Sequence, residues 1–177
     1  GAARRGRAVS PTGAALRIGQ GFDLHPFLAA DDDRGDRVLT LGGVVFPGEV
    51  PLQGHSDADA VAHACADALL GAAGLGDIGQ HFPDTDPAWA GADSLRLLAE
   101  VALRVRGAGW APVNIDCTVV AERPKLAPHR DTMAERLSAA VGAPVSVKAT
   151  RAEGLGALGR SEGIACLAVA LLVEAPA

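Results

Sequence analysis

Aromatic side chains are nearly absent from this chain, and that scarcity constrains its fold more than any other feature. Aromatic residues make up 3% of the 177 residues and tyrosine is absent, although hydrophobic residues make up 49%. Most of the hydrophobic residues are Ala, Val and Leu. A core of such small side chains reaches normal interior density only if helices approach their neighbours closely. The length fits one domain, which we expect to span residues 16–177.

Charge and hydropathy exclude two kinds of partner. The 16 Lys and Arg residues against 21 Asp and Glu residues give a net charge of -5, so no nucleic-acid partner is expected. The longest apolar run, residues 164–173, is far shorter than the ~18 residues of a membrane span. An acidic protein that binds a phosphorylated small molecule needs local cations, supplied by Arg and Lys or by metal ions.

The cysteines and the N-terminal segment bear on the compartment. Cys65, Cys117 and Cys166 are widely spaced and lie among aliphatic residues, which predicts buried free thiols in a reducing, cytoplasmic environment and no thiolate zinc site. Residues 1–15 carry three Arg and no acid. They are interpreted as a flexible basic tail outside the fold; a residual transit sequence, which would place the protein in a plastid, is the alternative.

Short strand-like runs alternate with longer helical ones, which predicts an α/β or α+β sandwich with helices on one face. We expect α+β, with a mixed four-stranded sheet. Strands are predicted at residues 16–24, 113–121, 145–150 and 163–174, and a hairpin at 38–46. Helices are predicted at 57–73, with Ser56 as N-cap, at 94–107 and at 128–141, and an irregular segment at 77–92.

Several acids and histidines have the spacing of a metal site. Asp23 and His25 are two residues apart on a predicted strand, so their side chains point to the same face. On the first helix, Asp59, His63 and Asp67 share one face, which is either functional or only the solvent side. With His55, these residues supply two or three imidazoles and a carboxylate, a set typical of zinc with one open position.

Two further groups carry charge in loops. Residues 77–86 place several acids in a Gly- and Pro-framed loop, which is either a ligand site or a cluster of Asx turns. Lys125 and Lys148 each follow a predicted strand, and residues 151–160 add Arg151, Glu153 and Arg160. This cluster is either a diphosphate clamp with its metal or ordinary surface charge. Residues 154–159 match G-x-G-x-x-G, but they lie too close to the C-terminal end for a dinucleotide-binding fold.

Three segments together resemble a known family. RIGQGFDLH at 17–25, GHSDADAVAHACADALLGAAGLGDIGQHFPDTDP at 54–87 and KATRAEGLGALGRSEGIAC at 148–166 are similar to the 2-C-methyl-D-erythritol 2,4-cyclodiphosphate synthase family. The resemblance covers about residues 16–174. It implies a homotrimer of α+β subunits with active sites at subunit interfaces. It also implies conversion of 4-diphosphocytidyl-2-C-methyl-D-erythritol 2-phosphate to the 2,4-cyclodiphosphate with release of CMP, in non-mevalonate isoprenoid precursor biosynthesis.

The resemblance also assigns ligands. It implies that Asp23, His25 and His63 bind Zn²⁺, and that Glu153 binds a second ion, Mg²⁺ or Mn²⁺, at the diphosphate. Residues 77–79 and 82–86 would hold the methylerythritol part of the substrate. The implied substrate-binding residues are Asp23, Leu24, His25, His55, Ser56, Asp77, Ile78, Gly79, Phe82, Pro83, Asp84, Thr85, Asp86, Ala121, Pro124, Lys125, Leu126, Ala127, Thr150, Arg151, Ala152, Glu153, Ala157 and Arg160.

The chain departs from the family at three positions. Gln20 replaces a usual His, and Ala157 replaces a common aromatic near the trimer axis, where Arg160 would face a prenyl phosphate. Arg151 stands where a Thr supports the transferring phosphate, and we expect Arg151 to take over that role, with His55 as the other catalytic residue. Two alternatives are a trimeric regulator that binds metal or nucleotide without turnover, and a metal-dependent phosphohydrolase.

Overall fold

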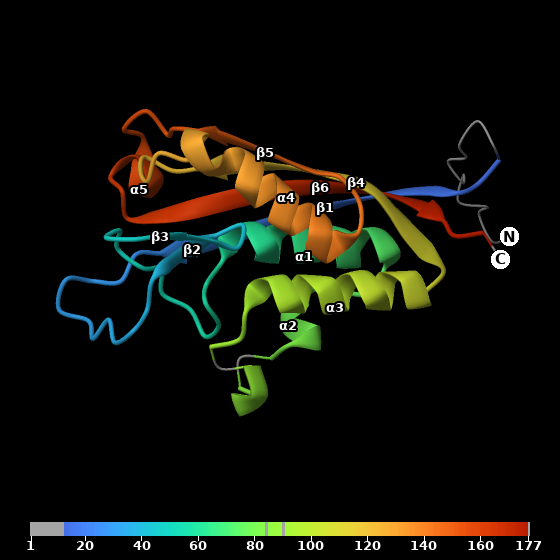
Figure 1. Ribbon diagram of the computed structural model, residues 1–177, viewed down its shortest axis with the longest axis horizontal. Helices are drawn as coiled ribbons and strands as arrows, with labels where there is room; N and C mark the ends of the chain where they lie inside the picture. Colours follow the sequence, from blue (N-terminus) through green and yellow to red (C-terminus); the bar gives the residue numbers. More distant parts are fainter. Residues whose placement is uncertain (1–12, 84, 90, 177) are drawn as a thin grey trace, which may run out of the picture.

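The computed structural model describes residues 13–83, 85–89 and 91–176, which form a mixed sheet covered by helices (Figure 1). The strands are β1 (Leu16–Pro26), β2 (Leu39–Leu41), β3 (Val44–Phe46), β4 (Trp110–Val120), β5 (Val145–Thr150) and β6 (Gly163–Glu174). The four-stranded sheet has the order β1-β6-β4-β5. β6 pairs antiparallel with β1 and β4, whereas β4 and β5 are parallel, so the predicted mixed α+β fold is confirmed.

The helices gather on one face of this sheet. They are α1 (Ala60–Ala73), α2 (Ile78–His81), η1 (Pro87–Trp89), α3 (Ser94–Gly107), η2 (Ala127–His129), α4 (Arg130–Val141) and α5 (Gly156–Gly159). α1 packs on β1 and β6, α4 packs on β5, and α3 packs across both helices from outside. No described helix is long and apolar enough to cross a membrane. Among the described residues, no long helix covers the opposite face of the sheet, here called the open face, which carries exposed apolar side chains, among them Ile18, Phe22 and Leu24.

Two glycines let α1 lie directly on β1. A Cβ atom at Gly19 would stand 2.1 Å from the carbonyl oxygen of Ala68, and one at Gly21 would stand 1.9 Å from that of Ala64. No side chain fits in such a gap, so the helix backbone approaches the strand only because these positions are glycine. Gly19, Gly21, Asp23 and His25 alternate along one face of β1. The glycines therefore bring α1 down beside the two polar side chains that follow them.

The first helix begins later than its sequence pattern predicts. α1 starts at Ala60, and its N-cap is Asp59 rather than Ser56. The Asp59 carboxylate accepts hydrogen bonds from the N–H groups of Val61 and Ala62, each at 3.1 Å, which satisfies the first turn. An Asp in the middle of a polar run is not distinguished by the pattern from its neighbours. The cap is decided by burial, since Asp59 is fully enclosed.

The other elements follow the predictions with small shifts. Helix α3 and strands β5 and β6 have the predicted bounds. β4 begins at Trp110, three residues early, because Trp110 pairs with Glu174. Pro128 lies in the 3-10 turn η2, so α4 starts at Arg130. The segment expected to be irregular contains the short helices α2 and η1.

The G-x-G-x-x-G segment and the last residues of the predicted tail lie beside β6. The G-x-G-x-x-G segment forms the single turn α5 before β6, which pairs antiparallel with both neighbours, so it opens no dinucleotide-binding unit. Residues 1–12 of the predicted tail lie outside the described residues. Ala15, at its end, is buried and accepts a hydrogen bond from the N–H of Glu174 at 2.9 Å.

Candidate active site and metal centre

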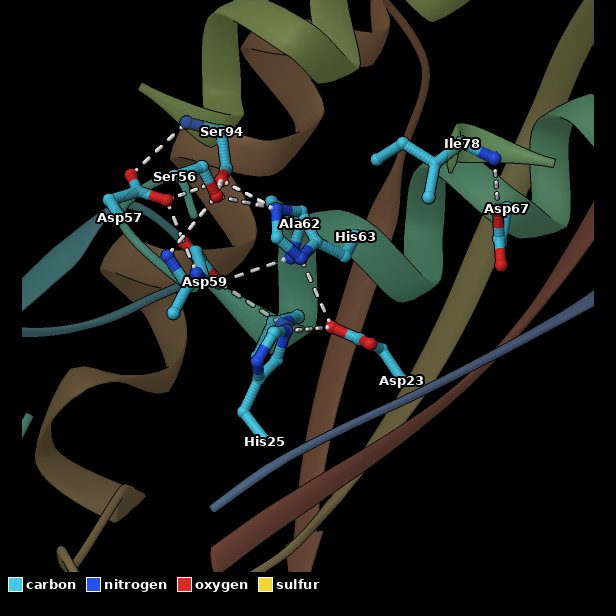
Figure 2. A network of polar contacts seen from close by, with 12 residues as sticks. Asp23, His25, Ser56, Asp57, Asp59, Ala62, His63, Asp67, Ile78 and Ser94 are labelled. Carbon is cyan, nitrogen blue, oxygen red and sulfur yellow. Dashed lines mark hydrogen bonds and ion pairs between the residues drawn. The ribbon is translucent and has the colours of Figure 1, made fainter. Parts of the chain in front are cut away.

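Asp23, His25 and His63 meet between β1 and the first turns of α1 (Figure 2). Oδ2 of Asp23 lies 2.9 Å from Nε2 of His25 and 3.1 Å from Nδ1 of His63. One ligand atom from each of the three side chains lies within 4.8 Å of the other two. The grouping of these three residues, predicted from the sequence, is therefore confirmed.

The hydrogen bonds of His25 leave a lone pair facing this group. Its Nδ1 lies 2.7 Å from the carbonyl oxygen of Gln53, which only accepts, so Nδ1 donates. In the neutral ring, Nε2 then carries a lone pair, and this buried atom faces Oδ2 of Asp23 2.9 Å away. A lone pair facing the Asp23 carboxylate is stable only with a cation or a proton between them. The residues fit a divalent metal that accepts nitrogen and oxygen ligands.

His63 is oriented from behind by two residues outside the ligand group. Its Nε2 lies 2.8 Å from Oγ of Ser94, and that hydroxyl in turn donates to Oδ1 of Asp57 (Figure 2). Because the hydroxyl has one proton and gives it to Asp57, Ser94 accepts from Nε2–H of His63. Nδ1 of His63 is then the free lone pair, and it faces Asp23. Such a relay fixes the tautomer that a metal ligand needs.

The charges of the group reinforce one another. Burial raises the pKa of the Asp23 carboxyl, but the hydrogen bonds and positive charges of His25 and His63 outweigh it and leave that pKa well below its usual range. Burial lowers the pKa of His25, and the hydrogen bond with Asp23 outweighs that and raises it above 6.5. Without metal, a proton between Asp23 and His25 therefore satisfies the pair. A bound cation would have to displace it.

Asp59 and Asp67, which share the predicted helix face with His63, have structural roles instead. The Asp59 carboxylate also accepts the N–H groups of Gly42 at 2.8 Å and Gly43 at 2.6 Å, which ties the β2–β3 turn to α1. Burial raises the pKa of Asp59 to about 6, against the lowering effect of these amide donors. Asp67 accepts the N–H of Ile78 at 2.7 Å. Of that face, only His63 belongs to the ligand group.

Two separate cavities collect most of the remaining predicted residues. One, of about 310 Å³, adjoins the ligand group, and its lining is His25, Gly54, His55, Ser56, His63, Ile78, Gly79, Phe82, Trp89 and Leu97. The other, of about 520 Å³, is lined by Ala121, Glu122, Pro124, Lys125, Leu126, Ala127, Ala149, Thr150 and Arg151. The sequence-predicted residues thus gather in two places, which the single chain does not join into one pocket. We refer to them as the metal-side cavity and the strand-end cavity.

Other predicted residues lie outside both cavities. Asp77 is the N-cap of α2, and Leu24 is 52% exposed on the open face of the sheet. Arg160 is paired with Glu162 at 2.6 Å. Pro83, Thr85 and Asp86 follow α2, Ala152 and Glu153 follow β5, and Ala157 is exposed on α5. Asp84 lies outside the described residues.

Glu153 and Lys148, which the sequence analysis placed in one charged cluster, have different surroundings in the structure. The backbone of Glu153 has φ of 53°, a left-handed conformation that costs a non-glycine residue energy and is common at functional sites. Lys148 instead forms an ion pair with Asp116 on the sheet. Lys148 therefore forms an exposed ion pair on the sheet, while the role of Glu153 as a ligand stays a prediction.

Several site residues carried no signal in the sequence. Gly54, Trp89 and Leu97 line the metal-side cavity, and Ser94 touches a metal-ligand candidate. The sequence places Trp89 in an irregular loop and Leu97 on an amphipathic helix. Both side chains are then expected to pack in the hydrophobic core. Ser94 reads as the start of a helix. The rarity of tryptophan was one available signal, because the chain has two tryptophans and one of them, Trp89, lies in the irregular segment at 77–92.

The sequence profile of the YgbB family matches residues 16–173. The chain belongs to the YgbB family. The match includes all three members of the metal-ligand group and both cavities of this YgbB-family chain.

Curated relatives cover nearly the same length. The 2-C-methyl-D-erythritol 2,4-cyclodiphosphate synthase of Bordetella petrii is 56% identical over 163 residues, covering 90% of this chain and 97% of that protein. The synthase of the same name from Chromobacterium violaceum is 54% identical over 163 residues, covering 90% and 99%. The family resemblance in the sequence is confirmed by both.

Solved structures of the family share the fold. The bifunctional IspDF of Campylobacter jejuni superposes with a TM-score of 0.83 at 39% identity, covering 91% of this chain and 43% of that one. A CDP complex of IspF from Plasmodium falciparum superposes with a TM-score of 0.76 at 32% identity, covering 91% and 97%. The YgbB fold of this chain is therefore seen both as a separate protein and within a larger one.

Proposed function

We propose that this protein is a 2-C-methyl-D-erythritol 2,4-cyclodiphosphate synthase that closes the cyclic diphosphate of its substrate and releases CMP. The observation that carries the proposal is the group of Asp23, His25 and His63 at the wall of the metal-side cavity. Relatives of this name match nearly the whole chain, and a family structure has CDP bound. The proposed location, the bacterial cytoplasm, rests on the bacterial relatives, and nothing in them supports the plastid alternative.

The proposed reaction is an intramolecular phosphoryl transfer. An oxygen of the substrate's 2-phosphate attacks the β-phosphorus of the cytidine diphosphate, a new P–O bond forms, and the P–O bond to CMP breaks. The attacking phosphate is already ionised at neutral pH, so the site needs no general base. Its task is to align two groups that repel each other and to neutralise their charge.

The residues of the metal-side cavity suit one half of that task. A Zn²⁺ ion held by Asp23, His25 and His63 would supply positive charge to the phosphate oxygens. His55 and Ser56 line the same cavity and would donate hydrogen bonds to the 2-phosphate. Ile78, Gly79 and Phe82 would enclose the methylerythritol part and exclude water from it.

The strand-end cavity suits the other half of the substrate. Lys125, Thr150 and Arg151 line it together with small residues such as Ala121 and Ala127, and they would bind the cytidine diphosphate part. Glu153, in its left-handed conformation beyond Arg151, would hold Mg²⁺ or Mn²⁺ at the diphosphate. A second cation there would neutralise the negative charge that the leaving group gains.

A homotrimer would bring the two cavities together. The proposed substrate needs both, yet one chain holds them apart. The open face of the sheet carries Ile18 at 73% exposure, Phe22 at 55% and Val169 at 46%, a row of apolar side chains that needs a partner surface. A neighbouring copy of this chain covers that face in the proposed assembly.

Product analysis tests the function. The purified protein is incubated with the cytidine diphosphate substrate and Zn²⁺ with Mg²⁺ or Mn²⁺, and products are separated by phosphorus NMR. We expect CMP and a cyclic diphosphate in equal amounts. Linear phosphate products would instead indicate a metal-dependent phosphohydrolase, and binding without products would indicate a regulator.

A further inference from the structure

A wall of three apolar side chains separates the metal-side cavity from a second hollow behind it. Phe82, Trp89 and Leu97 line both the metal-side cavity of about 310 Å³ and an outer cavity of about 390 Å³. Phe82 and Trp89 meet edge to face, with ring centroids 5.0 Å apart and an interplanar angle of 82°. The position of this wall sets the width of the metal-side cavity. What holds the wall in place therefore bears on substrate binding.

Arg104 of α3 contacts His81, the last residue of α2, and Phe82, the residue that follows it. Its guanidinium carbon lies 4.9 Å from the ring centroid of Phe82. Its Nη1 lies 2.6 Å from Nδ1 of His81, the residue before Phe82. Its Nε is held by Oε1 of Glu100 at 2.9 Å, one turn earlier on the same helix. The Arg104 guanidinium thus contacts two consecutive residues, His81 and Phe82, from a fixed position on α3.

The hydrogen bonds of His81 give this contact a definite direction. Nε2 of His81 lies 2.8 Å from the carbonyl oxygen of Leu75 and therefore donates to it. In the neutral ring Nδ1 then accepts, and Arg104 is its donor. The imidazole links the end of α1 to α3 through the last residue of α2.

The short helix α2 depends on such outside support. It has four residues and none of them is buried, so it cannot be stable through its own packing. Its first N–H, at Ile78, is bonded to Asp67 of α1, and its last residue, His81, is bonded to Arg104 of α3. Both ends are fixed from neighbouring helices, which places Ile78 and Gly79 in the lining of the metal-side cavity.

We infer that Arg104 is a positioning residue for the substrate, acting through His81 and Phe82 on the wall of the metal-side cavity. The inference rests on the proposed function, which makes this cavity the site of the methylerythritol part. Arg104 touches neither the metal ligands nor the inner cavity lining except through this wall. Its planar fork serves three partners at once, a geometry that a Lys ammonium does not reproduce.

Steady-state kinetics test the inference in the full-length protein. We expect Arg104→Met to raise KM roughly tenfold while kcat falls less than about threefold, since the metal and phosphate contacts are intact. Arg104→Lys should recover part of the loss through His81. The matched control is Arg96→Met, on the same helix and the same outer cavity, where no described hydrogen bond or ring contact joins the side chain to the wall. An unchanged KM in Arg104→Met would overturn the inference.

Tryptophan fluorescence tests the same point without turnover. The chain has two tryptophans, so the Trp110→Phe background reports on Trp89 alone. In that background, Arg104→Met should shift the emission to longer wavelength and increase quenching by acrylamide, whereas Arg96→Met should change neither. Identical spectra for Arg104→Met and its parent would overturn the inference even if the protein proved not to be a synthase.

A double substitution separates positioning through His81 from a general loss of stability. If Arg104 acts through His81, then Arg104→Met should add much less to KM in a His81→Leu background than in the parent. Urea unfolding midpoints of all variants identify any that are simply unfolded. Fully additive effects on KM would show that Arg104 acts elsewhere and would contradict the proposed route.

Discussion

Arg151 and Glu122 form an ion pair at the edge of the strand-end cavity. Nη2 and Nε of Arg151 lie 2.7 Å and 2.8 Å from the same oxygen, Oε2 of Glu122. The Glu122 side chain is 9% exposed and the Arg151 side chain 65%, so the acid is fixed in the wall while the guanidinium reaches outward. The hydrogen bond with Arg151 lowers the pKa of Glu122, which keeps it ionised. Arg151 thus has an anchor and retains free donors.

That anchor bears on the expected catalytic role of Arg151. Its Nη1 donors are available to a phosphate oxygen in the cavity while the other edge of the fork stays on Glu122. We expect Arg151→Ala to reduce kcat roughly a hundredfold at saturating substrate, the usual effect of losing one transition-state donor. Arg151→Thr, which restores a hydroxyl, should lose less. Turnover of Arg151→Ala at the parent rate would mean that the side chain only faces solvent.

Removal of one metal ligand should remove the metal. We expect His63→Ala to bind less than one tenth of the zinc of the parent after dialysis, measured by elemental analysis. His55→Ala is the matched control, because His55 lines the same cavity but lies outside the ligand group, so it should keep its zinc. Full zinc content in His63→Ala would remove that residue from the ligand set.

The relay behind His63 should tune the metal affinity. Ser94→Ala removes the hydroxyl that accepts from Nε2–H of His63 and donates to Asp57, while the backbone N–H at position 94 stays on Oδ2 of Asp57. Loss of such an outer partner typically weakens metal binding 10- to 100-fold, and we expect about that change in a zinc competition assay with a fluorescent chelator. Ser56→Ala should have a smaller effect, because Oγ of Ser56 stands 3.2 Å from the same nitrogen. Equal affinities in Ser94→Ala and the parent would contradict the relay.

Short-range periodicity predicted only part of the group of Asp23, His25 and His63, and the family resemblance supplied the complete set. Asp23 and His25 alternate on one strand, and the two glycines before them predict a close neighbour, which proves to be α1 with His63. The same periodicity grouped Asp59 with His63 wrongly. Asp59 is buried as a cap and as an acceptor for the β2–β3 turn, 16 and 17 residues away in sequence. A helical repeat carries no information on such a contact.

The parts that sequence reasoning missed share one physical origin. The roles of Ser94 and Arg104 arise from side chains that meet 31 and 23 residues away along the chain. On its helix, each fits an ordinary local role, Ser94 as a first-turn residue and Arg104 as a basic residue near a C-terminal end. Only the packing of α3 against α1 and α2 gives them partners in the site.

The paired protonation of Asp23 and His25 predicts how zinc affinity depends on pH. The pKa of His25 is raised, so its proton must leave before the metal binds, and affinity should rise about tenfold per pH unit below that pKa and level off above it. In the metal-free protein, the contributions of His25 and Asp23 to folding stability change with pH in opposite directions. The His25 contribution to stability is present below pH 6.5 and lost as pH rises through the raised pKa. The Asp23 contribution is present above pH 3.8 and lost as pH falls through the lowered pKa.

Two measurements check this pH dependence. Zinc titrations between pH 6 and pH 8 should give the rising affinity, and urea unfolding of the chelator-treated protein should give a stability maximum between the two ordinary pKa values of 3.8 and 6.5. Asp23→Asn removes the charge that raises the pKa of His25, so its stability maximum should flatten. A maximum of the same height in Asp23→Asn would show that the pair contributes nothing to pH-dependent stability.

The open face of the sheet provides the test of assembly. Phe22 is 55% exposed in the row of apolar side chains on β1, and a Glu there would bury a charge in any subunit interface. We expect Phe22→Glu to sediment near the chain mass of 17.9 kDa, whereas the parent sediments at three times that mass. Because Asp23, His25 and His63 come from one chain, the variant should keep its zinc while losing turnover. Leu103→Glu, 63% exposed on α3 away from the sheet, is the matched control and should remain assembled and active. A parent that is monomeric at nanomolar concentration with full activity would contradict shared sites, since each chain would then hold a complete one.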